Sequence, residues 1–558
     1  MLFLQPIHGS SVMIEEMIAV VSEGLSGLDA GTQAKLLVGL QILFFLAAFR
    51  VLWLLRMTRR IQFVAPKKRR AGKPVHYLGF LYFVVCLLFA GTLLYQSTWH
   101  LMGVLRPEFV SFMKRYDRRL FNPAHQLNRG RILDRNGKVL AENRRGKKGV
   151  ERRYPLGAKA SHVVGYLHPV YGLNGIEKAL EGSLAGTRAE SVEDWEQLGK
   201  SILTQNKSAG GKDLRLTLDA RLQSKAYELL GRRTGAVIVM GVRSGALYVV
   251  CSRPSFDPHQ LDGRLFTSSG RQAPLLNRAL RGLYPPGSTF KVAVGAAAME
   301  RGLPDVIECG RGVATSSGVK PIRDHVYYER RKQNRTWGGY GKIGMGTAMA
   351  ESSNVYFASL GVRLGHAGFQ SIGERMGFNQ GITVLEGADG TIEAAPSQLP
   401  RLAPRDQYGL AQMGIGQGQV TATPLQMALI TAAVANSGVA PSPRLLARQE
   451  PKSRGRFMAA ATADKLAVLL RRVVTDGTAK RAAQLRWALA GKTGTAENGR
   501  GPSHSWFTGY FPFELPQFVV CVVVEHGGYG SATALPVAMG IIEEAGRLGL
   551  IQVPAEQG

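Results

Sequence analysis

The residues of this sequence that are best arranged for chemistry are Ser288 and Lys291, which follow a Tyr-Pro-Pro-Gly run at 284–287. The prolines and the glycine force a turn and prevent a helix upstream of Ser288. The apolar stretch 292–299 then predicts a buried helix, on which residues three apart share a face. A buried lysine loses affinity for its proton and can act as a base, and N–H groups at a helix N-terminus can hold an oxyanion. The pattern predicts a serine nucleophile activated by a lysine.

The Ser-x-x-Lys spacing by itself is weak evidence for a nucleophile, because it occurs twice more in the chain. Ser111 precedes Lys114, and Ser317 precedes Lys320 in a stretch rich in Thr, Ser and Gly. Neither pair opens an apolar helix. We therefore interpret both as chance matches.

A second cluster is Ser352-Ser353-Asn354, which follows a segment that reads as helix. A Ser and an Asn two residues apart on a tight turn can point the same way. Together they offer a proton relay and an amide hydrogen bond. Taken alone, the cluster would be interpreted as an N-cap or a turn.

A third cluster, Gly491 to Thr495, lies on a predicted strand before a loop. Glycine in a strand lets another extended backbone approach closely. Lys492 adds positive charge, and the hydroxyls of Thr493 and Thr495 can bind a carboxylate. Taken alone, this cluster too is only weak evidence for a functional site.

The elements that must position these clusters are strands and helices of one large domain. Asp219 is expected to cap a helix that follows a short strand. Five segments read as strands: 235–242, 246–252, 487–496, 505–512 and 518–525. The first two flank Arg243-Ser244-Gly245, a hairpin signal, and a helical pattern over 532–550 ends the fold. The long segment between the second and the third of these strands reads mostly as helix, so we expect an α+β architecture over 216–558. Before it, over 98–215, we expect an irregular β-containing stalk, or pedestal.

Two apolar stretches near the N-terminus, 36–55 and 75–97, are long enough to cross a bilayer as helices. The first contains Gln41 and Arg50, so an interfacial or buried helix is the alternative there. The loop 56–74 between them holds eight basic residues and no acidic one. Short loops rich in Lys and Arg stay in the cytoplasm. We therefore expect residues 1–35, and everything after the second segment, to be extracytoplasmic.

Composition excludes several classes of protein. The chain has 45% hydrophobic and 20% charged residues, which is not the composition of a disordered protein. Four cysteines cannot form a disulfide scaffold, although one disulfide among Cys251, Cys309 and Cys521 stays open. There is no Walker A loop and no His-Glu-x-x-His. The net charge of +30 comes without a nucleic-acid-binding motif, so no nucleic-acid partner is expected.

The three clusters are much stronger in combination, because Ser352 and Lys492 lie 64 and 204 residues after Ser288. This is the order of the S-x-x-K, S-x-N and K-T-G motifs of penicillin-recognising serine acyltransferases. Flanking segments extend the similarity: 253–258 (RPSFDP), 277–291 (NRALRGLYPPGSTFK), 413–428 (MGIGQGQVTATPLQMA) and 505–512 (SWFTGYFP). Residues 129–137 match R-G-x-I-x-D-R-x-G. Over about 125–545 the chain resembles a class B penicillin-binding protein, a monofunctional peptidoglycan D,D-transpeptidase.

The resemblance implies a five-stranded antiparallel sheet flanked by helices and a two-step acyl transfer. Ser288 would attack the D-Ala–D-Ala bond of a donor stem peptide, with Lys291 as base. Ser352 and Lys492 would pass a proton to the leaving D-Ala. Asn354 would bind an amide of the donor. An amine of a neighbouring stem peptide would then take the acyl group, and β-lactams would acylate the same serine.

The resemblance also assigns the substrate groups and the partners. Thr493 and Thr495 would hold the terminal carboxylate, Gly494 would allow close approach, and the N–H groups of Ser288 and Thr495 would form the oxyanion hole. No metal or organic cofactor is implied. The implied partners are peptidoglycan stem peptides, β-lactams, the cytoplasmic membrane and a glycan polymerase of the SEDS family.

Other functions stay open on the sequence alone. A D,D-carboxypeptidase or a β-lactamase uses the same constellation with water as acceptor. A non-catalytic β-lactam sensor or assembly scaffold is a third class, although every motif residue is present. The sequence does not distinguish elongation, division and sporulation.

Overall fold

The computed structural model of the protein describes residue 50 and the ranges 86–97, 128–146, 149–186, 211–269, 273–315, 318–403, 405–499 and 501–552. The chain forms two compact units, Met1–Leu120 and Phe121–Gly558. In the first unit, residues 86–97 are helical. No helix within the described ranges has the length and apolar character needed to cross a bilayer. The predicted spans 36–55 and 75–97 fall mostly outside those ranges.

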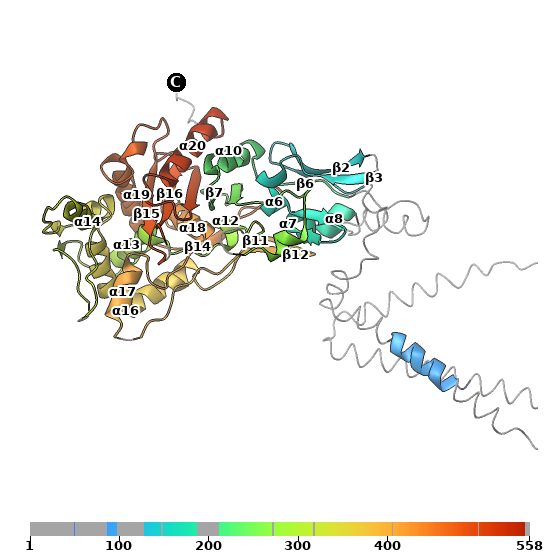
Figure 1. The fold of residues 1–558 in the computed structure, drawn as a ribbon, viewed down its shortest axis with the longest axis horizontal. Helices are drawn as coiled ribbons and strands as arrows, with labels where there is room; N and C mark the ends of the chain where they lie inside the picture. The colour runs from blue at the N-terminus through green and yellow to red at the C-terminus, as the bar shows by residue number, and fades with distance from the viewer. Residues whose placement is uncertain are drawn as a thin grey trace, which may run out of the picture. The chain divides into compact units, whose positions relative to one another are not determined.

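A five-stranded sheet forms the centre of the second unit (Figure 1). Its strands lie in the order β15 (Ala490–Ala496), β16 (His504–Phe511), β17 (Phe518–Val524), β7 (Gly235–Gly241) and β8 (Leu247–Arg253). Every neighbouring pair is antiparallel. All residues of β7, β16 and β17 are buried, which explains why β7 and β17 are short continuous apolar runs. The predicted sheet is confirmed, and β15 is one of its two edge strands.

Helices cover both faces of this sheet. On one face, α10 (Ala220–Leu230) packs against β8 and against α20 (Ala534–Arg547), and α20 contacts β17. On the other face, α18 (Pro424–Ala435) contacts β7, β16 and β17. The carboxylate of Asp219 caps α10 as expected, because it accepts from the N–H groups of Arg221 and Leu222.

The long segment between β8 and β15 is largely helical, as predicted. Its helices are α11 (Gly263–Thr267), α12 (Arg278–Arg281), α13 (Lys291–Glu300), α14 (His325–Lys332), α15 (Met345–Ala350), α16 (Asn354–Met376), α17 (Gln407–Gly414), α18 and α19 (Ala460–Thr475). Three small antiparallel pairs join them: β9 (Ile307–Cys309) with β10 (Gly341–Ile343), β11 (Ile382–Gly387) with β12 (Gly390–Ala394), and β13 (Val439–Pro441) with β14 (Ser453–Arg456). Cys251, Cys309 and Cys521 are buried and free, so the disulfide left open by the sequence does not form.

The pedestal has a four-stranded sheet in the order β3 (Gly149–Arg153), β2 (Val139–Gly146), β1 (Ile132–Leu133) and β6 (Leu214–Arg215). Smaller elements complete it: α6 (Ser161–Val164), β4 (Tyr166–His168), β5 (Gly172–Asn174), α7 (Gly175–Ala179) and α8 (Glu181–Ala185). The pedestal is joined to the large domain through Asp134, whose Oδ2 accepts from the N–H of Ala220 at the start of α10.

Candidate active site

Ser288 lies in a short 3-10 turn, Gly287–Phe290, that runs directly into α13. The predicted buried helix is α13, which begins at Lys291, directly after this turn. Gly287 makes the turn possible because its φ is +53°, a left-handed conformation that suits glycine. Ser288 is partly exposed, whereas Lys291, one turn later, is fully buried. The hydroxyl is thus accessible, and the amine is shielded from water.

The turn that carries Ser288 is fixed against the edge of the sheet. The indole Nε1–H of Trp506 on β16 donates to the carbonyl of Pro285 at 3.0 Å. The N–H of Gly287 donates to the carbonyl of Gly416 at 2.9 Å. A Cβ at Gly287 would lie 2.7 Å from the carbonyl oxygen of Thr495. These contacts place the predicted nucleophile beside β15, the strand of the third cluster.

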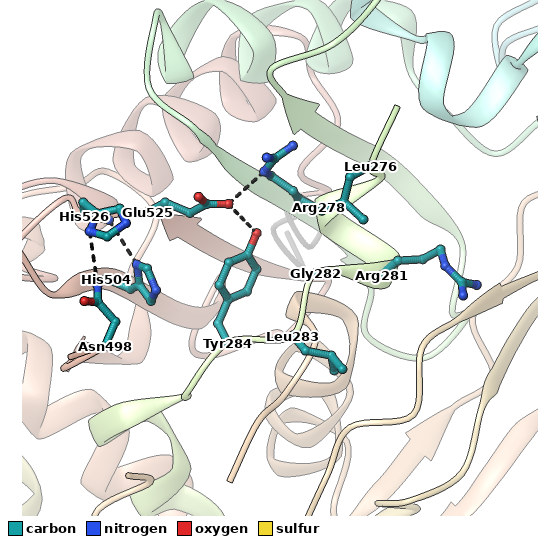
Figure 2. Close-up of a pocket in the computed structure, with 10 residues that line it drawn as sticks. All are labelled: Leu276, Arg278, Arg281, Gly282, Leu283, Tyr284, Asn498, His504, Glu525 and His526. Carbon is teal, nitrogen blue, oxygen red and sulfur yellow. Dashed lines mark hydrogen bonds and ion pairs between the residues drawn. The ribbon is translucent and has the colours of Figure 1, made fainter. Parts of the chain in front are cut away.

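A buried ion pair holds the residues just upstream of this turn. Glu525 follows β17, and its Oε1 accepts from Arg278 Nε and from the hydroxyl of Tyr284, both at 2.8 Å. Figure 2 shows the three side chains converging at one wall of a cavity of about 350 Å³. His504 and His526 lie toward its other end. The ion pair ties the segment that carries Ser288 to the sheet.

The side chain of Lys291 joins the first and second clusters. Its Nζ donates to the carbonyl of Ser352 at 2.7 Å and to Asn354 Oδ1 at 2.9 Å. A longer hydrogen bond of 3.3 Å reaches the hydroxyl of Ser352. The three oxygens fix the amine in one place. A proton can therefore pass between Lys291 and the Ser352 hydroxyl without a change of fold.

Burial shifts both lysines of the site toward the neutral amine. Desolvation lowers the pKa of Lys291 well below its usual value, the nearby charge of Lys492 lowers it further, and the Asp324 carboxylate opposes the shift. Burial also lowers the pKa of Lys492 to about 7. A neutral amine can accept a proton from a serine hydroxyl, whereas an ordinary lysine is protonated at pH 7. The site therefore holds two amines that give up their protons more readily than an ordinary lysine.

The second cluster is bent sharply at Ser352, whose φ is +57°. This left-handed conformation is uncommon for a residue with a side chain and is held here by its surroundings. Ser353 is the N-cap of α16, and its hydroxyl accepts from the N–H of Tyr356. Asn354 is the first residue of that helix. The bend turns the Ser352 carbonyl and hydroxyl, together with Asn354 Oδ1, toward Lys291.

Asp324 is a further residue of this site that the sequence interpretation missed. Its Oδ1 accepts from the Ser353 hydroxyl at 3.0 Å, from the N–H of Asn354 at 2.5 Å and from the N–H of Val355 at 3.1 Å. Asp324 directly precedes α14, so its sequence position suggests a cap for that helix. Its side chain makes no cap hydrogen bond to α14 and instead caps α16. Asp324 is therefore a positioning residue for the second cluster.

Replacement of Asp324 by alanine is expected to lower the free energy of unfolding by about 3 kcal/mol, because buried donors lose their acceptor. Asp324→Asn keeps an oxygen acceptor but loses the charge. Since that charge raises the pKa of Lys291, its loss should move the rise of the acylation rate to lower pH. Urea unfolding and the pH profile of acylation by benzylpenicillin measure the two effects.

Asp262→Ala is the matched control for this prediction, because the partly exposed Asp262 also accepts from two N–H groups as the cap of α11. Loss of this partly exposed cap should lower the free energy of unfolding less than loss of Asp324 and should leave the pH profile unchanged. A pH profile of Asp324→Asn identical to that of the wild type would contradict the electrostatic part of this assignment.

The third cluster lies on β15 beside the Ser288 turn. Gly494 is needed there, because a Cβ would lie 2.9 Å from both Thr289 Cγ2 and Trp506 Cβ. The hydroxyls of Thr493 and Thr478 are 2.6 Å apart, and Thr495 Oγ1 accepts from the N–H of Gly530 at 3.4 Å. The structure thus brings the third cluster against the turn of the first. The rival serines, Ser111 and Ser317, lie outside the described residues.

Comparison with known proteins identifies the class to which this fold and site belong. Residues 235–543, more than half of the chain, match the family described as the penicillin binding protein transpeptidase domain. Residues 129–212 match the penicillin binding protein A dimerisation domain. The chain therefore belongs to the penicillin-binding protein transpeptidase family, and its predicted resemblance to class B members is confirmed.

Particular relatives agree with this class. Peptidoglycan D,D-transpeptidase MrdA of Haemophilus influenzae is 28% identical over 459 residues, which cover 70% of this chain and 69% of that protein. The solved D,D-transpeptidase domain of a peptidoglycan glycosyltransferase from Eggerthella lenta is 30% identical to this chain. The match covers 76% of this chain and 100% of that domain, with a TM-score of 0.63. Penicillin-binding protein A from M. tuberculosis, solved as a ceftriaxone acyl-enzyme, shares the fold with a TM-score of 0.66 at 24% identity, over 76% of this chain and 99% of its own.

Proposed function

We propose that the protein is a serine-type peptidoglycan D,D-transpeptidase that cross-links stem peptides and is acylated by β-lactams. The single observation that carries this function is the buried amine of Lys291, held by Ser352 and Asn354 one turn after a partly exposed serine. The family and the named relatives support the same activity.

In the first step, Ser288 Oγ attacks the carbonyl carbon of the D-Ala–D-Ala bond, and its proton passes to Lys291. The N–H groups of Ser288 and Thr495 stabilise the oxyanion. The bond to the terminal D-Ala then breaks, and Ser352 and Lys492 return a proton to its amine. The products are an ester on Ser288 and free D-alanine.

In the second step, the amine of a neighbouring stem peptide attacks the ester carbonyl and loses a proton to the site. The bond to Ser288 Oγ breaks, and the hydroxyl is restored. One D-alanine is released for each cross-link formed. Thr493 and Thr495 bind the donor carboxylate, with Gly494 giving the donor backbone room beside β15.

The two-step reaction is tested by supplying the full chain with uncross-linked peptidoglycan strands and analysing the fragments by mass spectrometry. We expect peptide-linked dimers, one released D-alanine per dimer, and loss of both with benzylpenicillin. Monomers shortened by one D-alanine, without dimers, would make the protein a carboxypeptidase. Penicillin labelling with no D-alanine released would identify a sensor or scaffold.

We also propose that residues 36–55 and 75–97 anchor the protein in the cytoplasmic membrane, with the loop 56–74 inside and the catalytic domain outside. The eight bases of that loop support this orientation. An extracytoplasmic catalytic domain suits a peptidoglycan substrate. Because a transpeptidase makes no glycan, we propose a membrane polymerase of the SEDS family as partner.

A further inference from the structure

A strongly basic lobe, residues 318–342, follows β9, contains α14 and ends within β10. It has seven basic and two acidic residues. Six of the basic residues are exposed: Lys320, Arg330, Arg331, Lys332, Arg335 and Lys342. Of the two acids, Asp324 is buried under α16, so Glu329 is the single exposed carboxylate of the lobe. The surface of this lobe is therefore strongly positive.

The charges of the basic lobe are not balanced by the fold. Lys342 lies opposite Glu308 in the pairing of β10 with β9, but among the described residues no ion pair involves any of the other five exposed bases. The helix α14 has no buried residue, although neighbouring α15 and α16 bury most of one face. Exposed like charges repel one another and destabilise a compact state. These exposed charges therefore do not stabilise the domain, but they can bind an anionic ligand.

The basic lobe is attached directly to the second catalytic cluster. The Nδ2 group of Asn354 donates to the carbonyl of Arg323 at 3.1 Å. Oδ1 of Asp324 accepts from the N–H of Asn354. At the end of the lobe, the hydroxyl of Tyr340 reaches Glu351, the residue before Ser352, at 3.4 Å. The lobe is therefore attached near both of its ends to the second cluster, which Lys291 joins to the turn that carries Ser288.

We propose that the basic lobe binds the carboxylates of the acceptor peptidoglycan strand. The inference rests on the proposed function and adds a subsite to it. Each stem peptide ends in a carboxylate, so a strand presents a repeated row of negative charges. The donor carboxylate is already assigned to Thr493 and Thr495 on β15, which leaves the Ser352 side for the strand that brings the amine. Guanidinium groups such as those of Arg330 and Arg331 match carboxylates with paired N–H donors.

The test is a binding measurement that needs no turnover. The full chain is first acylated with benzylpenicillin, so that Ser288 is blocked, and is then titrated with uncross-linked peptidoglycan strands. In the triple variant Arg330→Ala, Arg331→Ala, Lys332→Ala, affinity should fall about tenfold, because each of the three exposed charges makes a small contribution to binding. The difference should shrink at high salt, which screens exposed charges. Strands whose carboxylates have been amidated should bind both proteins equally weakly.

The control variant removes the same charge elsewhere: Arg232→Ala, Arg233→Ala and Arg243→Ala, three exposed residues beside β7. It should bind the strands as the wild type does. Acylation of Ser288 by benzylpenicillin reports whether the catalytic groups stay in place in each variant.

Equal affinities of the two triple variants, or no binding of strands to the wild type, would overturn the proposal. The proposal would also be overturned if the wild type bound vesicles of anionic phospholipid through these three residues and did not bind the strands. A failure of the proposed function has a different signature, namely the absence of dimers from the wild type in the turnover assay.

Discussion

Replacement of Ser288 by alanine is expected to abolish covalent labelling by benzylpenicillin and to lower cross-linking by about 10⁶-fold, the usual effect of removing a serine nucleophile. Without the hydroxyl no ester can form. The fold should survive, because Ser288 is partly exposed and its turn is held by contacts of Pro285 and Gly287. Labelling of membranes with a fluorescent penicillin, with the wild type beside the variant, measures the effect.

Ser111→Ala and Ser317→Ala are the controls for this prediction, since both serines begin the same Ser-x-x-Lys spacing. Both variants should be labelled as strongly as the wild type. Persistent covalent labelling of Ser288→Ala would mean that the nucleophile is one of the other two serines.

Replacement of Lys291 by methionine is expected to slow acylation by about 10²–10⁴-fold, the usual contribution of a general base. Methionine has an apolar side chain of similar length, so the buried site is filled. The residual rate should no longer follow the protonation of Lys291. Stopped-flow measurement of acylation against pH gives both the rate and its pH dependence.

Lys291→Arg separates the role of the base from the role of the charge. A guanidinium keeps the positive charge but cannot lose its proton at neutral pH. We therefore expect Lys291→Arg to be as slow as Lys291→Met. Acylation by Lys291→Arg at close to the wild-type rate would show that Lys291 acts through its charge alone.

The sheet and the turn that carries Ser288 could be predicted because the signals for both are local in the sequence. The strands β7 and β17 are short apolar runs bounded by turn residues, and they are buried on both faces. The turn before Ser288 is specified by Pro285, Pro286 and Gly287, whose backbone preferences do not depend on the rest of the fold.

Contacts between distant segments could not be predicted in the same way. Asp324 lies 30 residues before the helix that it caps, and its own sequence position points to α14. The left-handed backbone at Ser352 has no signal either, because serine does not favour that conformation. The resemblance to a family supplied the roles of Ser352, Asn354 and Lys492, which the residues alone left ambiguous.

The two buried lysines have an evolutionary consequence. Lys291 and Lys492 are fully buried, and keeping an amine out of water costs free energy that an apolar side chain would not. Random variants selected only for folding or expression should therefore accumulate apolar residues at these positions. Purifying selection on cell-wall synthesis has to act against that drift in every generation. A lineage that no longer needed the activity would lose these lysines early, so their absence from a related chain would indicate a pseudoenzyme.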